Sequence, residues 1–111
     1  DDDQVVEQIE KQLYKLIDVL KVNDLPPEES IERELALIKV NAGAQNRSEV
    51  LHIVNIFRAK IVDVSSRAVV VEITGGSDKV EALIALLKPY GIREIVRTGQ
   101  IAMLRSNPRL R

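Results

Sequence analysis

Residues 31–50 read IERELALIKVNAGAQNRSEV and hold the change of pattern that decides the fold. Residues 31–40 are rich in β-branched and long aliphatic side chains, and their apolar residues lack the spacing of a helical face. This pattern predicts a strand. A loop over residues 41–45 follows it. Asn46 can cap the next helix by accepting the amide hydrogen of Glu49, whose carboxylate can reach back to Asn46. This stretch therefore predicts a strand, a loop and the start of a helix.

The pattern continues beyond this stretch with a second helix and three more strands. The first helix is expected to run to about Arg58, and strands over 60–64 and 68–74, joined by a tight turn at Ser65-Ser66, form a hairpin. Gly75-Gly76 ends the hairpin and Ser77 is expected to cap the second helix. The buried stripes of the two helices are predicted to be Val50, Ile53, Val54 and Phe57, and Val80, Leu83, Ile84 and Leu87.

The second helix is expected to end over residues 88–91. Pro89 disfavours the helical conformation in Lys88, and Gly91 can adopt a left-handed turn. The last strand is predicted over 92–98, with residues 101–104 as an extension of it past Gly99.

The element order from residue 31 onward is strand, helix, strand, strand, helix, strand. This order predicts an α+β fold, the ferredoxin-like βαββαβ sandwich, with two helices on one face of a four-stranded sheet. Residues 1–25, with a helical pattern over 4–17 and a short strand over 19–25, repeat the end of the same pattern. We therefore expect the helix-strand remnant of one such domain over 1–25, a linker over 26–30, a complete domain over 31–105 and a frayed tail over 106–111.

The two faces of the predicted sheet are both rich in apolar residues. Leu35 and Leu37 point to one side of the first strand, while the third strand directs Val70 to one side and Val71 to the other. The two helices cover only one side. We therefore expect the uncovered side to pack on another subunit or domain, the alternative being that a loop or the first unit covers it.

The composition is that of an ordinary soluble protein. The chain has 111 residues, 16 basic and 17 acidic side chains and a net charge of -1, so no charge excess indicates nucleic acid or an acidic membrane as partner. The longest purely aliphatic run, residues 82–87, is far shorter than the roughly 20 apolar residues of a membrane-spanning helix. The three aromatic residues, Tyr14, Phe57 and Tyr90, fall on helices or helix ends, where they provide no stacking platform for RNA bases.

The residues of catalytic and metal sites are scarce. The chain has no cysteine, which excludes a disulfide, a thiolate zinc site and a cysteine nucleophile. The single histidine, His52, is predicted to be solvated on a helix. The C-terminal end is locally basic, with Arg93, Arg97, Arg105, Arg109 and Arg111, but scattered arginines usually solvate a surface. Acidic surface residues balance them: Glu28, Glu29, Glu32 and Glu34. We expect no catalytic, cofactor-binding or metal-binding residues.

A weak candidate for ligand binding is the loop that leads into the first helix. Asn41, Gly43 and Asn46 surround a helix N-terminus, where backbone amides can receive a small carboxylate. The alternative is that this loop is only a flexible connector.

Five runs of the sequence, in order, closely resemble one protein family. They are QIEKQLYKLIDVLKV (8–22), ERELALIKV (32–40), NRSEV (46–50), IFRAKIVDV (56–64) and GIREIVRTG (91–99). They resemble the regulatory, or small, subunit of acetohydroxyacid synthase, also called acetolactate synthase. That family has an N-terminal ACT domain, which binds the inhibitor valine at a dimer interface, and a C-terminal ferredoxin-like domain.

The resemblance implies a non-catalytic subunit that activates a catalytic large subunit and takes part in feedback control of valine, leucine and isoleucine biosynthesis. Thiamine diphosphate, magnesium and FAD would belong to that catalytic partner. The resemblance also implies a homodimer or higher oligomer, in the cytoplasm or in the plastid of a plant or alga. Counterparts of the first strands and helix of the ACT domain, with its effector loop, are absent, so no valine-contact residue is carried over.

Two other functions fit the pattern of residues. One is a stand-alone small-molecule sensor that uses Asn41, Gly43 and Asn46. The other is a purely structural dimerisation domain of ferredoxin-like fold.

Overall fold

The computed structural model describes residues 26–106, so the helix and strand expected within residues 4–25 and the tail beyond Ser106 lie outside it. Residues 33–100 form one compact unit, and the described residues 26–32 and 101–106 belong to a second. The elements are η2 (Pro27–Glu29), β1 (Ser30–Asn41), α2 (Arg47–Ile56), β2 (Lys60–Val64), β3 (Ala68–Gly75), α3 (Ser77–Leu87), η3 (Lys88–Tyr90), β4 (Ile92–Arg97) and β5 (Ile101–Leu104).

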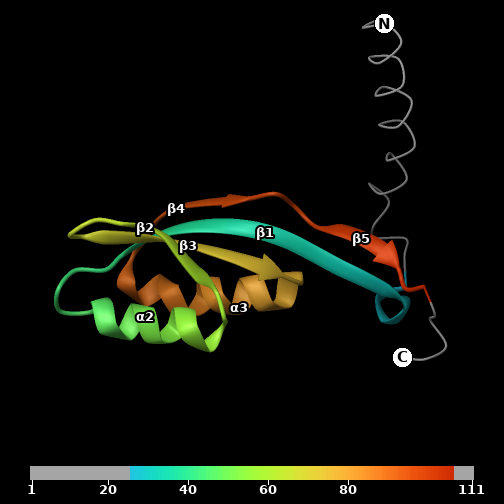
Figure 1. Cartoon of the computed structure of the whole chain (residues 1–111), viewed down its shortest axis with the longest axis horizontal. Helices are drawn as coiled ribbons and strands as arrows, with labels where there is room; N and C mark the ends of the chain where they lie inside the picture. The colour runs from blue at the N-terminus through green and yellow to red at the C-terminus, as the bar shows by residue number, and fades with distance from the viewer. Residues whose placement is uncertain (1–25, 107–111) are drawn as a thin grey trace, which may run out of the picture. The chain divides into compact units, whose positions relative to one another are not determined.

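The described strands form one antiparallel sheet with the order β2-β3-β1-β4, and β5 pairs with β1. In β1, residues 34–41 pair with residues 68–75 of β3 and residues 36–40 pair with residues 92–97 of β4. Helices α2 and α3 lie on the same side of the sheet (Figure 1). This arrangement confirms the ferredoxin-like fold expected from the element order.

The core lies between the two helices and the covered face of the sheet. Every second residue of β1, from Ala36 to Val40, is fully buried there, because side chains along a strand alternate between the two faces. Both predicted helix stripes are confirmed: Ile53 and Phe57 are partly buried against the core, and the other six residues are buried. The core residues are Ala36, Ile38, Val40, Ala42, Val50, Val54, Val69, Val71, Ile73, Val80, Leu83, Ile84 and Leu87.

The predicted side-chain caps of both helices are wrong. Asn46 precedes α2 but makes no capping hydrogen bond, because its backbone angles (φ -122°, ψ 5°) are not the extended ones that direct a side chain at the helix amides. The Glu49 carboxylate does not reach back to Asn46 either, and instead accepts a hydrogen bond from Tyr90. Ser77 is the first residue of α3, and Gly76 occupies the cap position without a side chain.

The ends of three other elements also differ slightly from the predictions. The residues expected to form a linker include one turn of 3-10 helix over Pro27–Glu29, and Ser30 already belongs to β1. Residues 101–104 form a separate strand, β5, and between β4 and β5 Gly99 adopts a left-handed conformation (φ +83°). The helix end was predicted only in part: Lys88 keeps helical angles (φ -52°, ψ -44°) although Pro89 follows it, and the chain continues as η3 until Gly91 (φ +97°), whose left-handed turn was predicted.

Replacing Leu83 with alanine should strongly destabilise the domain, because Leu83 has no exposed surface and its removal leaves a cavity beside the sheet. We expect a loss of about 2–5 kcal/mol in the free energy of unfolding, measured by urea denaturation. Leu86→Ala on the same helix is the matched control, because Leu86 is 48% exposed. Its loss should stay within about 0.5 kcal/mol, and equal losses for the two variants would contradict the assigned core.

Candidate functional site

The side of the sheet away from α2 and α3, which we call the open face, carries a mixture of apolar and charged side chains. Strand alternation and register place these residues on it: Leu35, Leu37 and Lys39 of β1, Lys60 and Asp63 of β2, Val70, Glu72 and Thr74 of β3, and Glu94 and Val96 of β4. The expectation of an apolar open face is therefore only partly met, because charged residues stand among the apolar ones, including Lys39 and Glu94 near its centre. Opposite charges are paired there, and the Nζ atom of Lys39 lies 3.6 Å from Oε1 of Glu94.

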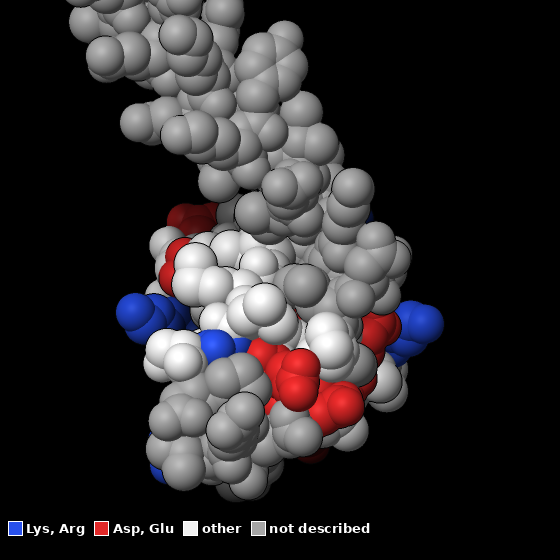
Figure 2. Space-filling model, turned by 90° about the vertical axis from the view of Figure 1, so that its right-hand side faces the viewer, with Lys and Arg blue, Asp and Glu red and all other residues white. Residues whose placement is uncertain are grey.

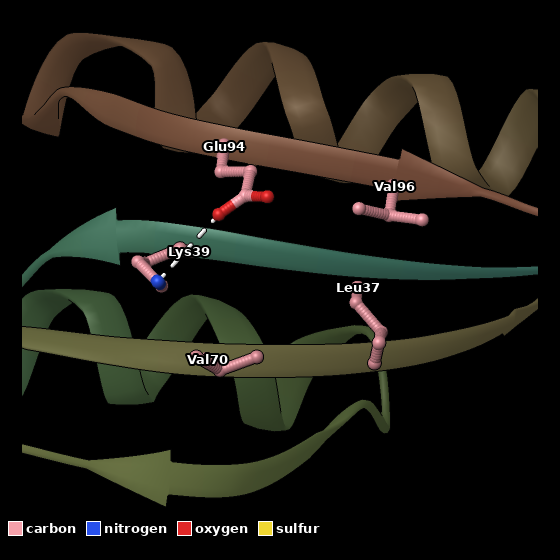
Figure 3. A pocket seen from close by; sticks show the side chains of 5 residues that line it. All are labelled: Leu37, Lys39, Val70, Glu94 and Val96. Carbon is pink, nitrogen blue, oxygen red and sulfur yellow. Dashed lines mark ion pairs between the residues drawn. The ribbon is translucent and has the colours of Figure 1, made fainter.

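A shallow hollow lies in the middle of the open face. It is lined by Leu37, Lys39, Val70, Glu94 and Val96, whose side chains project from three strands on the side opposite the helices (Figure 3). Its volume of about 200 Å³ is below the roughly 300–1,000 Å³ of typical small-molecule pockets. The hollow is thus smaller than a typical enclosed ligand site.

An ion-pair cluster lies on the covered side of the sheet. Arg97, at the end of β4, donates from Nε to Oε1 of Glu34 at 2.6 Å and also pairs with Glu81 of α3. The Glu34 side chain is only 4% exposed, and its carboxylate faces the guanidinium. Hydrogen bonds from Arg97 first to Glu34 and then to Glu81 raise the pKa of Arg97 further above its ordinary value. The cluster joins β1, β4 and α3.

The loop with the predicted ligand residues is held by hydrogen bonds within the domain. The Asn41 side-chain oxygen accepts a hydrogen bond from Nε of Arg93, and the Gly43 carbonyl accepts the backbone amides of Asn46 and Arg47 at 3.3 and 2.9 Å. Asn41, Gly43 and Asn46 therefore lie in one loop before α2, as expected. Their role in binding a ligand stays a prediction.

Arg47 fixes the same loop from the first turn of α2. Its Nε and one terminal nitrogen donate to the Ala42 carbonyl at 3.0 and 2.8 Å, and that nitrogen also donates to the Ser65 carbonyl. Through this side chain the loop after β1 is tied to the turn between β2 and β3. Asn41 also packs against Gly91, where a Cβ atom would collide with its side-chain nitrogen.

The charges of the described residues are of both signs. Figure 2 shows one face on which acidic and basic side chains both occur among uncharged ones. Within residues 26–106 there is no group of three or more histidine, cysteine, aspartate or glutamate side chains placed to hold a metal ion. His52 is exposed on α2. None of the described helices combines the length and apolar character needed to cross a membrane.

Residues 33–106 match the family described as the small subunit of acetolactate synthase. The chain belongs to this family. A probable acetolactate synthase small subunit of Archaeoglobus fulgidus is 53% identical over 106 residues, which cover 96% of this chain and 66% of the relative. The acetolactate synthase small subunit of Bacillus subtilis is 56% identical over 100 residues, which cover 90% of this chain and 58% of the relative.

A solved structure agrees with these sequence comparisons. The acetolactate synthase small subunit from Thermotoga maritima superposes with a TM-score of 0.68 at 46% identity, over 96% of this chain and 67% of that one. The chain thus spans about 55–66% of the length of several curated small subunits that it matches. The resemblance noted in the sequence is confirmed at the level of family and fold.

Sequence reasoning missed the Glu34–Arg97 pair in this small-subunit domain. It treated Arg97 as one of several scattered surface arginines and Glu34 as part of an acidic surface. The signal was present, however, because Glu34 has the same strand phase as Ala36 and Ile38, whose side chains are fully buried. A carboxylate on the buried side of a strand requires a charged or hydrogen-bonding partner.

Replacing Glu34 with glutamine should destabilise the domain by about 1–3 kcal/mol, because it removes the buried charge that faces Arg97. Glu81→Gln is the matched control, since it removes the other carboxylate of the cluster at a side chain that is 61% exposed. That loss should be below about 1 kcal/mol. Urea denaturation measures both, and a larger loss for Glu81→Gln would refute the importance of burial.

Tyr90 should titrate above its ordinary pKa of 10.0, because the hydrogen bond to Glu49, followed by burial and the negative charge of Glu49, favours the neutral phenol. A Tyr14→Phe variant leaves Tyr90 as the single tyrosine, so its phenolate absorbance can be followed against pH. Glu49→Gln should shift the pKa of Tyr90 back toward 10.0.

The sign of the effect on stability follows from this raised pKa. The stabilisation from the Tyr90–Glu49 contact is fully present below pH 10.0 and is lost as the pH rises through the pKa of Tyr90 in the folded domain. Circular dichroism would establish that the domain stays folded during the titration. A Tyr90 pKa at or below 10.0 would contradict the hydrogen bond.

Proposed function

We propose that this chain is a non-catalytic regulatory subunit that binds the catalytic large subunit of acetohydroxyacid synthase and raises its activity. The observation that carries the proposal is the family match over residues 33–106, together with curated relatives at 53–56% identity that are named as small subunits of this enzyme. In this proposal thiamine diphosphate, magnesium and FAD are bound by the catalytic subunit. Feedback control by branched-chain amino acids is the physiological purpose.

The physical basis of such regulation is a difference in binding. A subunit that binds the active state of its partner more tightly than the inactive state shifts the equilibrium by that difference. Coupling of this kind is typically about 1–3 kcal/mol, or 5- to 150-fold. A rigid domain suits this role because its surface keeps one shape. In residues 33–100, Arg97 and Arg47 fix β4 and the loop before α2 to their neighbouring elements.

The direct test is acetolactate formation by a purified acetohydroxyacid synthase catalytic subunit titrated with this chain. We expect saturable activation of about 5- to 150-fold. A Leu83→Asp variant is the control, because it places a charge in the core and should remove both the fold and the activation. Saturation with the folded chain and none with the variant would support the proposal.

Valine in the same assay separates the remaining functions. Activation that valine does not reverse would place activating contacts in this chain without an effector site. Activation that valine reverses would show that an effector site is present, for which Asn41, Gly43 and Asn46 are the candidates. Valine binding in the absence of any activation would instead favour the stand-alone sensor. If the chain neither activates the catalytic subunit nor binds valine and still self-associates, it is a structural dimerisation domain and the proposal fails.

A further inference from the structure

We infer that the outer edge of β2 is a docking site for a short, extended and acidic segment of another protein, which adds a strand to the sheet beside β2. This inference goes beyond the proposed function and does not depend on it, since the edge is present whether or not the chain acts on a catalytic subunit. It rests on the backbone of β2, on the apolar side chains beside it and on the basic residues around it.

The backbone of β2 is paired on one side only. In the sheet order β2 stands at one end, and within residues 26–106 no strand pairs with its outer edge. On the inner side the Ser65 amide donates to the Ala68 carbonyl at 2.9 Å. Backbone groups of successive residues in a strand point to opposite edges, so the N–H and C=O of Val64 point away from β3. An extended peptide can hydrogen-bond to such groups and add a strand.

Apolar side chains lie beside this edge. Val62 and Val64 are 50% and 56% exposed. Arg47, in the first turn of α2, donates to the Ser65 carbonyl just beyond β2, so this side of α2 faces the edge. Leu51 lies one turn further along the same side of the helix and is 36% exposed. An added strand can therefore bury apolar side chains as well as pair its backbone.

The charges around the edge are mostly positive. Arg58 lies two residues before β2, Lys60 is its first residue and Arg67 lies in the turn that follows it. All three are exposed, and none forms an ion pair with another described residue. On the acidic side, Asp63 lies on β2 and Glu72 lies beside Lys60 on β3. This excess of positive charge favours an acidic segment, whereas the β2 edge of a second copy would bring the same basic residues against it.

Arg58 has a backbone conformation that favours glycine. Its φ of +55° is the only positive φ among the non-glycine residues of the described chain. A residue with a side chain pays a strain at this position that glycine avoids. No ion pair of Arg58 with another described residue offsets that strain. The arginine is explained if its guanidinium contacts a partner.

The shape of β2 limits the length of the segment. The strand has five residues, and its register with β3 shifts between Ile61 and Asp63. Bulges and lysines on an edge strand prevent long, flat pairing between sheet edges. The occupant that fits is therefore a short segment that alternates β-branched and acidic residues.

The first experiment uses a fluorescent peptide of alternating glutamate and valine, titrated with the whole 111-residue chain and followed by fluorescence anisotropy. We expect saturable binding that weakens as salt is added. A peptide of alternating lysine and valine should bind at least about 10-fold more weakly. No saturable binding of the acidic peptide, or equal binding of the two peptides, would overturn the inference.

Val64→Pro tests the contribution of the backbone. Proline removes the outward N–H, and it is tolerated on an edge strand because the pairing with β3 uses other groups. It should weaken binding of the acidic peptide at least about 10-fold, the effect expected for one lost hydrogen bond. Val64→Thr is the matched control, because it keeps the N–H and the β-branched shape and should bind as the unmodified chain does. Equal binding by the two variants, with both shown to be folded by circular dichroism, would refute strand addition at this edge.

Charge variants separate a role in binding from a role in the fold. Arg58→Gly should weaken binding at least about 3-fold, while the urea midpoint stays the same or rises because glycine is unstrained at a φ of +55°. Lys60→Gln should also weaken binding. Lys39→Gln is the matched control, since it removes a lysine from β1, which β3 separates from β2, and should leave binding unchanged. If Arg58→Gly lowers the urea midpoint and leaves binding unchanged, Arg58 serves the fold and the inference fails.

Discussion

The position of β1 at the centre of the sheet constrains the rest of this domain. Because β3 and β4 pair with its two edges, the side chains of β1 can reach only the two faces, and alternate residues must serve different environments. One set, from Ala36 to Val40, meets the helices and is fully buried. The other set, Leu35, Leu37 and Lys39, meets the open face and is only half-buried. A single strand therefore specifies both the core of the domain and its candidate contact surface.

The same strand explains why most of the fold could be predicted from the sequence. In a strand, successive side chains point to opposite faces, and in a helix a face repeats every 3.6 residues, as at Val80, Leu83, Ile84 and Leu87. Both periods are set by the local backbone geometry, so they can be recognised from neighbouring residues alone. The strand over 60–64 matches the structure at both ends. The topology then followed from the order of the elements, because only a few sheet topologies are compatible with this order of strands and helices.

The features that were not predicted depend on residues far apart in the chain. Whether Glu49 caps its own helix or accepts a hydrogen bond from Tyr90 is decided by η3, 41 residues away. Arg97 is indistinguishable in the sequence from a solvated arginine, and its role becomes visible only when β1 and β4 are paired and Glu34 lies beside it, 63 residues away. Asn46 precedes α2 as expected, but the loop from Ala42 gives it a backbone conformation that cannot cap.

The ion pairs on the two faces of the sheet differ in burial, and they therefore differ in what they contribute to the domain. On the covered face the charge of Glu34 is buried and held by one arginine, so it contributes to the stability of a fixed arrangement and has little freedom to meet a partner. On the open face the Lys39–Glu94 pair is longer, at 3.6 Å, and its side chains are 44% and 61% exposed. Such a pair is worth little to the isolated domain. Its charges can therefore reorganise at small cost, while the pair on the covered face holds β1 and β4 together.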